Sequence, residues 1–128
     1  MTQEEKNLLL KDLCGRLPYN IKVYDKNGNF NTSYVNLLHI NGKVSEAFVG
    51  NGMQCRTAPI DEIKPYLFPM SSMTEEQKKE WRSLMRCDLY GILYPTIKSF
   101  DYLYKNHIDV RGLISLGLAI DATGLNIY

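Results

Sequence analysis

The chain has 128 residues, with 15 lysines and arginines against 14 aspartates and glutamates, and a formal net charge of +1. This balance argues against a strongly basic nucleic-acid clamp and against a polybasic membrane anchor. Hydrophobic residues make up 45% of the chain, which argues against a disordered protein. We therefore expect a single globular domain, residues 1–128, that buries its core without disulfides or metal ions.

The N-terminal residues lack the basic start and the long apolar run of a secretory signal. Glu4 and Glu5 come first, and the leucines at 8–10 form only a triplet. The longest mainly apolar stretch, residues 113–120, is too short to span a bilayer. We therefore expect a cytoplasmic protein with no membrane segment.

Three cysteines, Cys14, Cys55 and Cys87, lie far apart in the sequence. Their odd number and the lack of a C-x-x-C pair argue against a disulfide framework or a zinc finger. The sequence favours three small buried side chains in a reducing compartment, and it leaves a redox role for any of them open.

The N-terminal region predicts a helix over residues 3–14. Thr2 and Glu5 have the spacing of a capping box, in which the two side chains bond each other's backbone amides. Gly15 is suited to a left-handed helix end, and Pro18 prevents the helix from resuming.

Residues 20–56 change to a strand pattern, with strands expected at 21–24, 30–40, 43–49 and 53–57. The turns expected between them lie at 25–29, Asn41–Gly42 and Asn51–Gly52. A two-residue loop at Asn41–Gly42 would pair Ile40 with Lys43, and would therefore place Val35 opposite Phe48 and His39 opposite Val44.

Three prolines punctuate residues 58–73, which indicates an extended connector. Thr74 and Gln77 form a second capping box that opens a helix ending near Asp88–Gly91. A third helix is expected at 97–106, and a strand at 118–122 closes the chain. The apolar residues expected on the inner face of the third helix are Ile97, Phe100, Leu103 and Tyr104.

The predicted fold class is therefore α+β. An N-terminal helix comes first, then a curved antiparallel sheet or small barrel of about three to five strands. Two C-terminal helices and a closing strand-like tail follow.

No phosphate-binding loop, complete dinucleotide fingerprint, nucleophile elbow or zinc-protease motif is present, so the sequence predicts no cofactor and no metal. The strongest candidates for chemistry are His107, Asp109 and Arg111, because a histidine beside a carboxylate can act as a general base. The alternative is that these three residues form a turn with a surface ion pair.

Lys78, Arg82 and Arg86 recur every four residues and could follow a phosphate backbone. Glutamates interleave with them, which favours a solvated, ion-paired helix face. Nine residues are tyrosine, a side chain that suits protein interfaces. The candidate interaction surface consists of Tyr66, Phe68, Tyr90, Tyr94 and Tyr102.

Three stretches, LCGRLPYNIKV at 13–23, IKPYLFPMSSMTEEQKKEW at 63–81 and NHIDVRGLISLGLAIDATGLNIY at 106–128, carry a family resemblance. Together they resemble a family of small uncharacterised proteins of gut Bacteroidales, their phages and mobile elements. The resemblance implies a bacterial or phage setting and an accessory role. It carries over no activity, cofactor or catalytic residue.

The sequence thus favours a non-enzymatic module, of phage or mobile-element type, that binds another protein, and it leaves a homodimer open. One alternative is a small enzyme with a site around His107, Asp109 and Arg111. The other is a weak nucleic-acid-binding protein that uses Lys78, Arg82 and Arg86, although the charge balance makes nucleic acid the less favoured partner.

Overall fold

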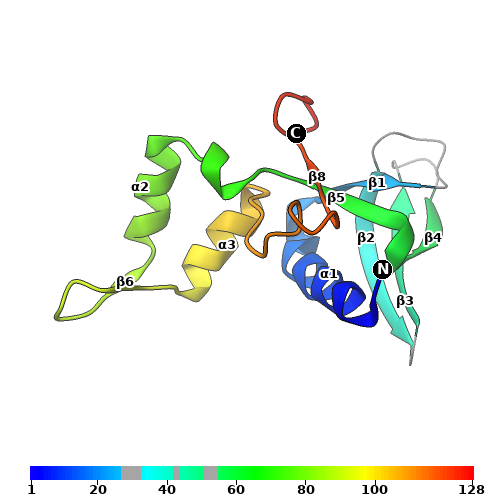
Figure 1. Cartoon of the computed structure of the whole chain (residues 1–128), viewed down its shortest axis with the longest axis horizontal. Coiled ribbons are helices and arrows are strands. Elements are labelled where there is room, and N and C mark those ends of the chain that lie inside the picture. The colour runs from blue at the N-terminus through cyan, green and yellow to red at the C-terminus, as the bar shows by residue number, and fades with distance from the viewer. Residues whose placement is uncertain (27–32, 42–43, 51–54) are drawn as a thin grey trace.

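The computed structural model describes residues 1–26, 33–41, 44–50 and 55–128. It confirms the α+β class, with helix α1 (Gln3–Arg16) first, then a sheet, and later helices α2 (Glu75–Ser83) and α3 (Ile97–Lys105) (Figure 1). Three short 3-10 turns are η1 (Leu17–Tyr19), η2 (Ile60–Glu62) and η3 (Met70–Ser72). The strands are β1 (Lys22–Asp25), β2 (Ser33–Asn41), β3 (Val44–Gly50), β4 (Cys55–Pro59), β5 (Ile63–Leu67), β6 (Arg86–Cys87), β7 (Leu93–Tyr94) and β8 (Ile120–Asp121).

The main sheet is mixed and open, with the strand order β4-β3-β2-β1-β5-β8. Its neighbours are antiparallel except β5 and β8, which pair in parallel through Tyr66–Ile120 and Leu67–Asp121. The expectation of an antiparallel sheet or small barrel is therefore wrong, since the described strands do not close. The chain returns to the sheet only after passing through α2 and α3, and such a crossover brings β8 back in the direction of β5.

The hairpin of β2 and β3 has a different register from the expected one. Asn41 pairs with Val44, so Asn41 belongs to strand β2 and not to the turn, and residues 42–43 lie outside the described residues. His39 consequently lies opposite Glu46. A β-bulge between Val35 and Leu37 shifts the pairing again, so one loop could not fix the register of the whole hairpin. The other two expected turns, at 27–29 and 51–52, also lie outside the described residues.

The segment that the prolines marked as a connector contains strand β5, which lies between β1 and β8. Pro65 pairs with Val23 of β1. The parallel pairing with β8 involves only Tyr66 and Leu67, so Pro65 has no described strand partner on its other side. A residue without an amide donor is tolerated at a position with this edge-like character.

Helix α1 has the predicted capping box between Thr2 and Glu5, but it does not end at Gly15. The helix continues through Arg16 into η1, and Asn20 takes the left-handed conformation with φ 54°. Gly15 instead lies against α3, because a Cβ built there would be 2.7 Å from the ring of Tyr104. The glycine therefore serves the close approach of two helices.

Among the side chains that the structure describes, two buried clusters hold the chain together. The larger one joins α1, β1, β5 and the stretch at 113–119, and it includes Leu9, Leu13, Val23 and Leu113. The smaller one lies beneath α2 and α3. Its members are Met73, Leu103 and Ile108, with Phe68, Trp81, Tyr102 and Val110 packed around them.

The region after α2 departs most from the sequence expectation. Helix α2 has the predicted Thr74–Gln77 box but ends at Ser83, where the Ser83 hydroxyl bonds the carbonyl of Glu80. Of the expected inner face of α3, Leu103 is buried, whereas Ile97 is 82% exposed and Phe100 is also exposed. The smaller core reaches Tyr102 and Leu103 in the C-terminal half of α3, and it leaves Ile97 and Phe100 of the first turn exposed.

Two further expectations concern the burial of the cysteines and the presence of a membrane-spanning helix. Cys14 and Cys87 are exposed free thiols, so the prediction of buried cysteines is wrong for both, while the side chain of Cys55 lies outside the described structure. No helix in the described ranges is long and apolar enough to cross a membrane.

Candidate functional site

The carboxylate of Asp109 is buried and bonded to backbone. Its two oxygens accept hydrogen bonds from the amides of Leu113 and Ile114 over 2.9 and 3.0 Å. Such a carboxylate closes a turn, because its oxygens are occupied by the amides that follow it.

Arg111 faces helix α1. Its guanidinium donates to the hydroxyl of Tyr104 over 3.3 Å, and its Nε lies 3.7 Å from Asp12. Asp12 is fully buried and pairs with the equally buried Arg16 through bonds of 2.6 and 3.1 Å. Arg16 also donates to the carbonyl of Ile108 over 2.6 Å, so this ion pair ties α1 to the segment after α3.

His107 faces the C-terminal tail. Its backbone has a φ of 58°, and its imidazole stacks on the ring of Tyr128 with centroids 3.6 Å apart. Burial, followed by the nearby charges of Arg16 and Lys22, lowers the pKa of His107 to about 4. Within the described ranges no hydrogen bond or ion pair joins His107 to Asp109 or Arg111, so the three sequence candidates point to three different places.

A second region, which we call the hairpin arm, comprises residues 84–100: the β6–β7 hairpin and the first turn of α3. The carboxylate of Asp88 organises it. One oxygen accepts the amides of Tyr90 and Ile92, each over 2.9 Å, and the other accepts the hydroxyl of Tyr94 over 3.1 Å. The bonds from Ile92 first, and then from Tyr90 and Tyr94, lower the pKa of Asp88. Gly91, with φ 79°, completes the turn.

The base of the arm is closed by the side chain of Thr96. Thr96 caps the start of α3 by accepting the amide of Ser99, and its hydroxyl donates to the carbonyl of Leu84 over 2.5 Å. The arm therefore has a defined geometry although it carries little buried apolar surface of its own.

Most apolar side chains of the arm are exposed. Leu89 is fully exposed and Tyr90 is 88% exposed, which leaves two large side chains at the hairpin tip without cover. The remaining exposed apolar residues of the arm are Ile92, Leu93, Tyr94, Ile97 and Phe100. In Figure 1 the hairpin lies beyond α2 and α3, at the end of the molecule farthest from the sheet.

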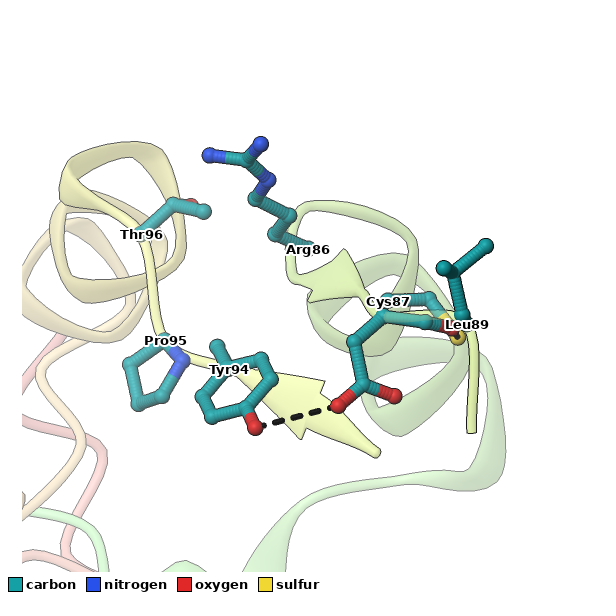
Figure 2. Close-up of a pocket in the computed structure, with 7 residues that line it drawn as sticks. Arg86, Cys87, Leu89, Tyr94, Pro95 and Thr96 are labelled. Carbon is teal, nitrogen blue, oxygen red and sulfur yellow. Dashed lines mark hydrogen bonds between the residues drawn. The ribbon is translucent and has the colours of Figure 1, made fainter. Parts of the chain in front are cut away.

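A groove of about 760 Å³ runs between the hairpin and the start of α3. Figure 2 shows Leu89 on one side of it and Pro95 and Thr96 on the other, with the Tyr94–Asp88 hydrogen bond between them. Arg86 also lines the groove and points away from that bond. The groove thus combines apolar walls with the cation of Arg86 and with the carboxylate of Asp88, which the hairpin's own hydrogen bonds engage.

The five aromatic residues proposed from the sequence lie in different surroundings. Tyr90 and Tyr94 are exposed on the arm. Tyr66 is only 7% exposed, and Phe68 packs against the smaller core. Tyr102 is partly buried and donates to Glu80 over 3.0 Å. Only the first two lie together on an open surface.

The three basic residues proposed for nucleic acid do not share one helix face. Lys78 pairs with Glu75 over 3.3 Å on α2, whereas Arg86 belongs to strand β6. Among the described residues no hydrogen bond or ion pair engages the side chain of Arg82, Arg86 or Lys98. Residues 84–100 carry Arg86 and Lys98 against the one carboxylate of Asp88, so the formal charge of the arm is positive.

A local signal for the hairpin exists in the sequence. Asp88-Leu89-Tyr90-Gly91 has aspartate first and glycine fourth, which is typical of a type I turn, and the Gly91 amide donates to the Asp88 carbonyl over 3.2 Å. The prediction that the second helix ends near these residues is therefore wrong, because they form the turn of a hairpin.

Comparison with known proteins yields no match to a family model, to a curated protein or to a solved structure. Within the described part of the chain no group of three or more histidine, cysteine, aspartate or glutamate side chains could hold a metal ion.

Proposed function

We propose that this protein is a non-enzymatic interaction module that binds another protein through the hairpin arm. The observation that carries the proposal is the exposure of Leu89 and Tyr90 at the tip of a hairpin that polar bonds hold in place. Exposed apolar patches on soluble domains mark interaction sites, and tyrosine is enriched among the residues that dominate binding energy.

The arm also has the order that a binding surface needs. An isolated two-stranded hairpin is marginally stable in water. Here Asp88 accepts three hydrogen bonds within the hairpin, and Thr96 bonds the carbonyl of Leu84, the residue that follows α2, across the base of the arm. A surface that is already ordered loses less conformational entropy on binding.

The charges of the arm indicate the chemistry of the partner. Arg86 lines the groove and Lys98 lies beside the exposed Ile97, while the one carboxylate of the hairpin, Asp88, is bonded inward. Two copies meeting through this surface would bring like charges together. We therefore propose a different protein as the partner, one that presents apolar side chains bordered by acidic residues.

A photo-crosslinking experiment tests this proposal. A photoreactive phenylalanine analogue replaces Tyr90 in one variant and the exposed Lys11 of α1 in the control. Both are expressed in a gut Bacteroidales cell, the setting that we propose from the sequence resemblance. We expect one protein to be crosslinked from position 90 and not from position 11.

Direct binding of that protein, once purified, completes the test. Hydrogen exchange should slow at residues 84–100 on binding and stay unchanged in α1 and the sheet. Slowing elsewhere with an unchanged arm would overturn the proposal, and so would crosslinking of position 90 only to a second copy of this chain.

A further inference from the structure

A second cavity, of about 420 Å³, lies between the end of α3, the segment after β5 and the C-terminal tail. Its apolar wall consists of Phe68, Ile108 and the ring of Tyr128. Phe68 and Tyr128 touch at a tilt of 51°, with centroids 6.0 Å apart, so the two rings form one aromatic corner. This cavity shares no lining residue with the groove of the arm and is independent of the proposed protein interface.

His107 is held rigidly in the wall of this cavity. Its carbonyl accepts the amide of Phe68 over 2.8 Å, and Tyr128 stacks on its ring. A left-handed backbone φ of 58° is uncommon for a residue other than glycine, and it persists only where the surrounding structure holds the backbone in place. The Nδ1 atom is buried without a partner, and no hydrogen bond of the described residues engages the Nε2 edge.

The imidazole in this wall is neutral near pH 7, because burial and the nearby Arg16 and Lys22 charges lower the pKa of His107. A neutral imidazole has one N–H donor and one acceptor nitrogen. An orphaned buried N–H is rarer than an orphaned acceptor, which favours the proton on Nε2. A residue that lines the cavity then carries a hydrogen-bond donor without a partner among the described residues.

The lining of the cavity is cationic. Lys105 is exposed at the rim, and no described residue forms an ion pair with it. No aspartate or glutamate lines the cavity. The remaining polar lining consists of Ser72, Gln77, Asn106 and Thr123. The Ser72 hydroxyl donates to the carbonyl of Pro69, and the Thr123 side chain bonds Asp121. The side-chain amides of Gln77 and Asn106 each keep an N–H that can donate to an anion.

We infer that this cavity binds a small aromatic anion, whose ring lies against the corner of Phe68 and Tyr128 and whose charged group meets Lys105. The volume lies within the range of small-molecule sites. A carboxylate and a phosphate ester share the chemistry that this lining recognises.

Calorimetric titration of the full chain at pH 7 tests the inference with three probes: phenylacetate, phenyl phosphate and the neutral phenylacetamide. We expect at least one anion to bind about tenfold more tightly than the amide, because a charge-assisted hydrogen bond is lost in the amide. The anion that binds more tightly shows whether the natural ligand carries a carboxylate or a phosphate ester. Equal affinities would mean that the cavity recognises an aromatic anion of either kind.

Two lysine variants locate the binding. Lys105→Gln should weaken binding of the preferred anion about tenfold. Lys79→Gln removes an exposed lysine of α2 that lies outside the cavity, and it should change nothing. His107→Asn, which tolerates the left-handed backbone, should also weaken binding. The inference is overturned if no probe binds, if the amide binds equally well, or if both lysine variants have the same effect.

Discussion

The hydroxyl of Tyr94 donates to the carboxylate of Asp88 over 3.1 Å, across a hairpin whose apolar side chains face outward. The same carboxylate accepts two backbone amides of the turn. Hydrogen bonds thus hold this hairpin in one conformation, whereas most hairpins are held by the packing of buried side chains. The apolar residues of the arm are thereby left available to a partner.

Asp88→Ala should disorder the hairpin without unfolding the domain, because the larger core contains no residue of the arm. Amide exchange at Tyr90 and Ile92 should accelerate strongly, while exchange in α1 stays at its original rate. Asp101→Ala, which removes an exposed carboxylate of α3, is the matched control and should leave the arm unchanged. Equal exchange in the two variants would contradict the role of Asp88.

The hairpin should also persist to unusually low pH. The pKa of Asp88 is lowered from 3.8, chiefly by the bond from Ile92, so its stabilising contribution is complete above the unfolded pKa. It is lost only as the pH falls through the lowered pKa of the folded state. Chemical shifts of the Tyr90 and Ile92 amides, followed from pH 7 downward, should remain native at pH 3.8. A hairpin already lost at that pH would refute this expectation.

Gly15→Ala should destabilise the protein, although alanine is the better helix former. The new Cβ would lie 2.7 Å from the ring of Tyr104, which Arg16 and Arg111 both contact. Overpacking of this kind costs about 1–3 kcal/mol, against a gain in helix propensity of about 1 kcal/mol. Denaturant unfolding measures the difference.

Lys11→Ala on the exposed face of the same helix should be close to neutral and serves as the control. In a Tyr104→Ala background the clash is absent, so Gly15→Ala should become neutral or stabilising there. The same loss of stability in both backgrounds would show that Tyr104 is not the cause.

The buried pair of Asp12 and Arg16 should be strongly coupled. Asp12→Ala leaves the guanidinium of Arg16 buried without its carboxylate, which costs about 3–5 kcal/mol. Replacing both residues with apolar ones, Asp12→Leu with Arg16→Met, should cost less than the sum of the single changes. Additive losses in a double-mutant cycle would contradict the coupling.

His107 should make the protein less stable in mild acid. The pKa of His107 is lowered to about 4 in the folded state, so the unfolded chain binds more protons between pH 6.5 and about 4. Stability should therefore fall as the pH falls through that window. The stability of His107→Asn, measured by denaturant unfolding at each pH, should depend less steeply on pH than that of the unmodified protein. If the stabilities of the two proteins depend on pH with the same slope, a group other than His107 is responsible for the loss of stability.

Local signals were predictable from the sequence. The capping boxes of Thr2 with Glu5 and of Thr74 with Gln77 depend only on residues three apart, and both are present. The end of α1 could not be predicted in this way. Gly15 is needed because Tyr104, far along the chain, lies against it, and this contact exists only in the folded protein.

The candidate site was predictable only in part. Tyr90 and Tyr94 could be chosen from the sequence because tyrosine suits protein interfaces. Their position on a hairpin depends on Asp88 and Gly91, which the sequence pattern assigned to the end of the second helix. The apolar stripe of α3 indicates a face that something covers. It does not indicate what, and this chain leaves Ile97 and Phe100 exposed.

The most direct test of the central claim is the dissociation constant of the purified partner for three forms of the chain. Leu89→Ser with Tyr90→Ser removes the two most exposed apolar side chains of the arm, and Leu125→Ser removes an exposed leucine of the C-terminal tail. We predict that the arm variant binds at least about 30-fold more weakly, as expected for loss of an interface centre worth about 2 kcal/mol, while Leu125→Ser binds like the original chain. Equal affinities of the arm variant and the original chain would contradict the claim that the arm is the binding surface.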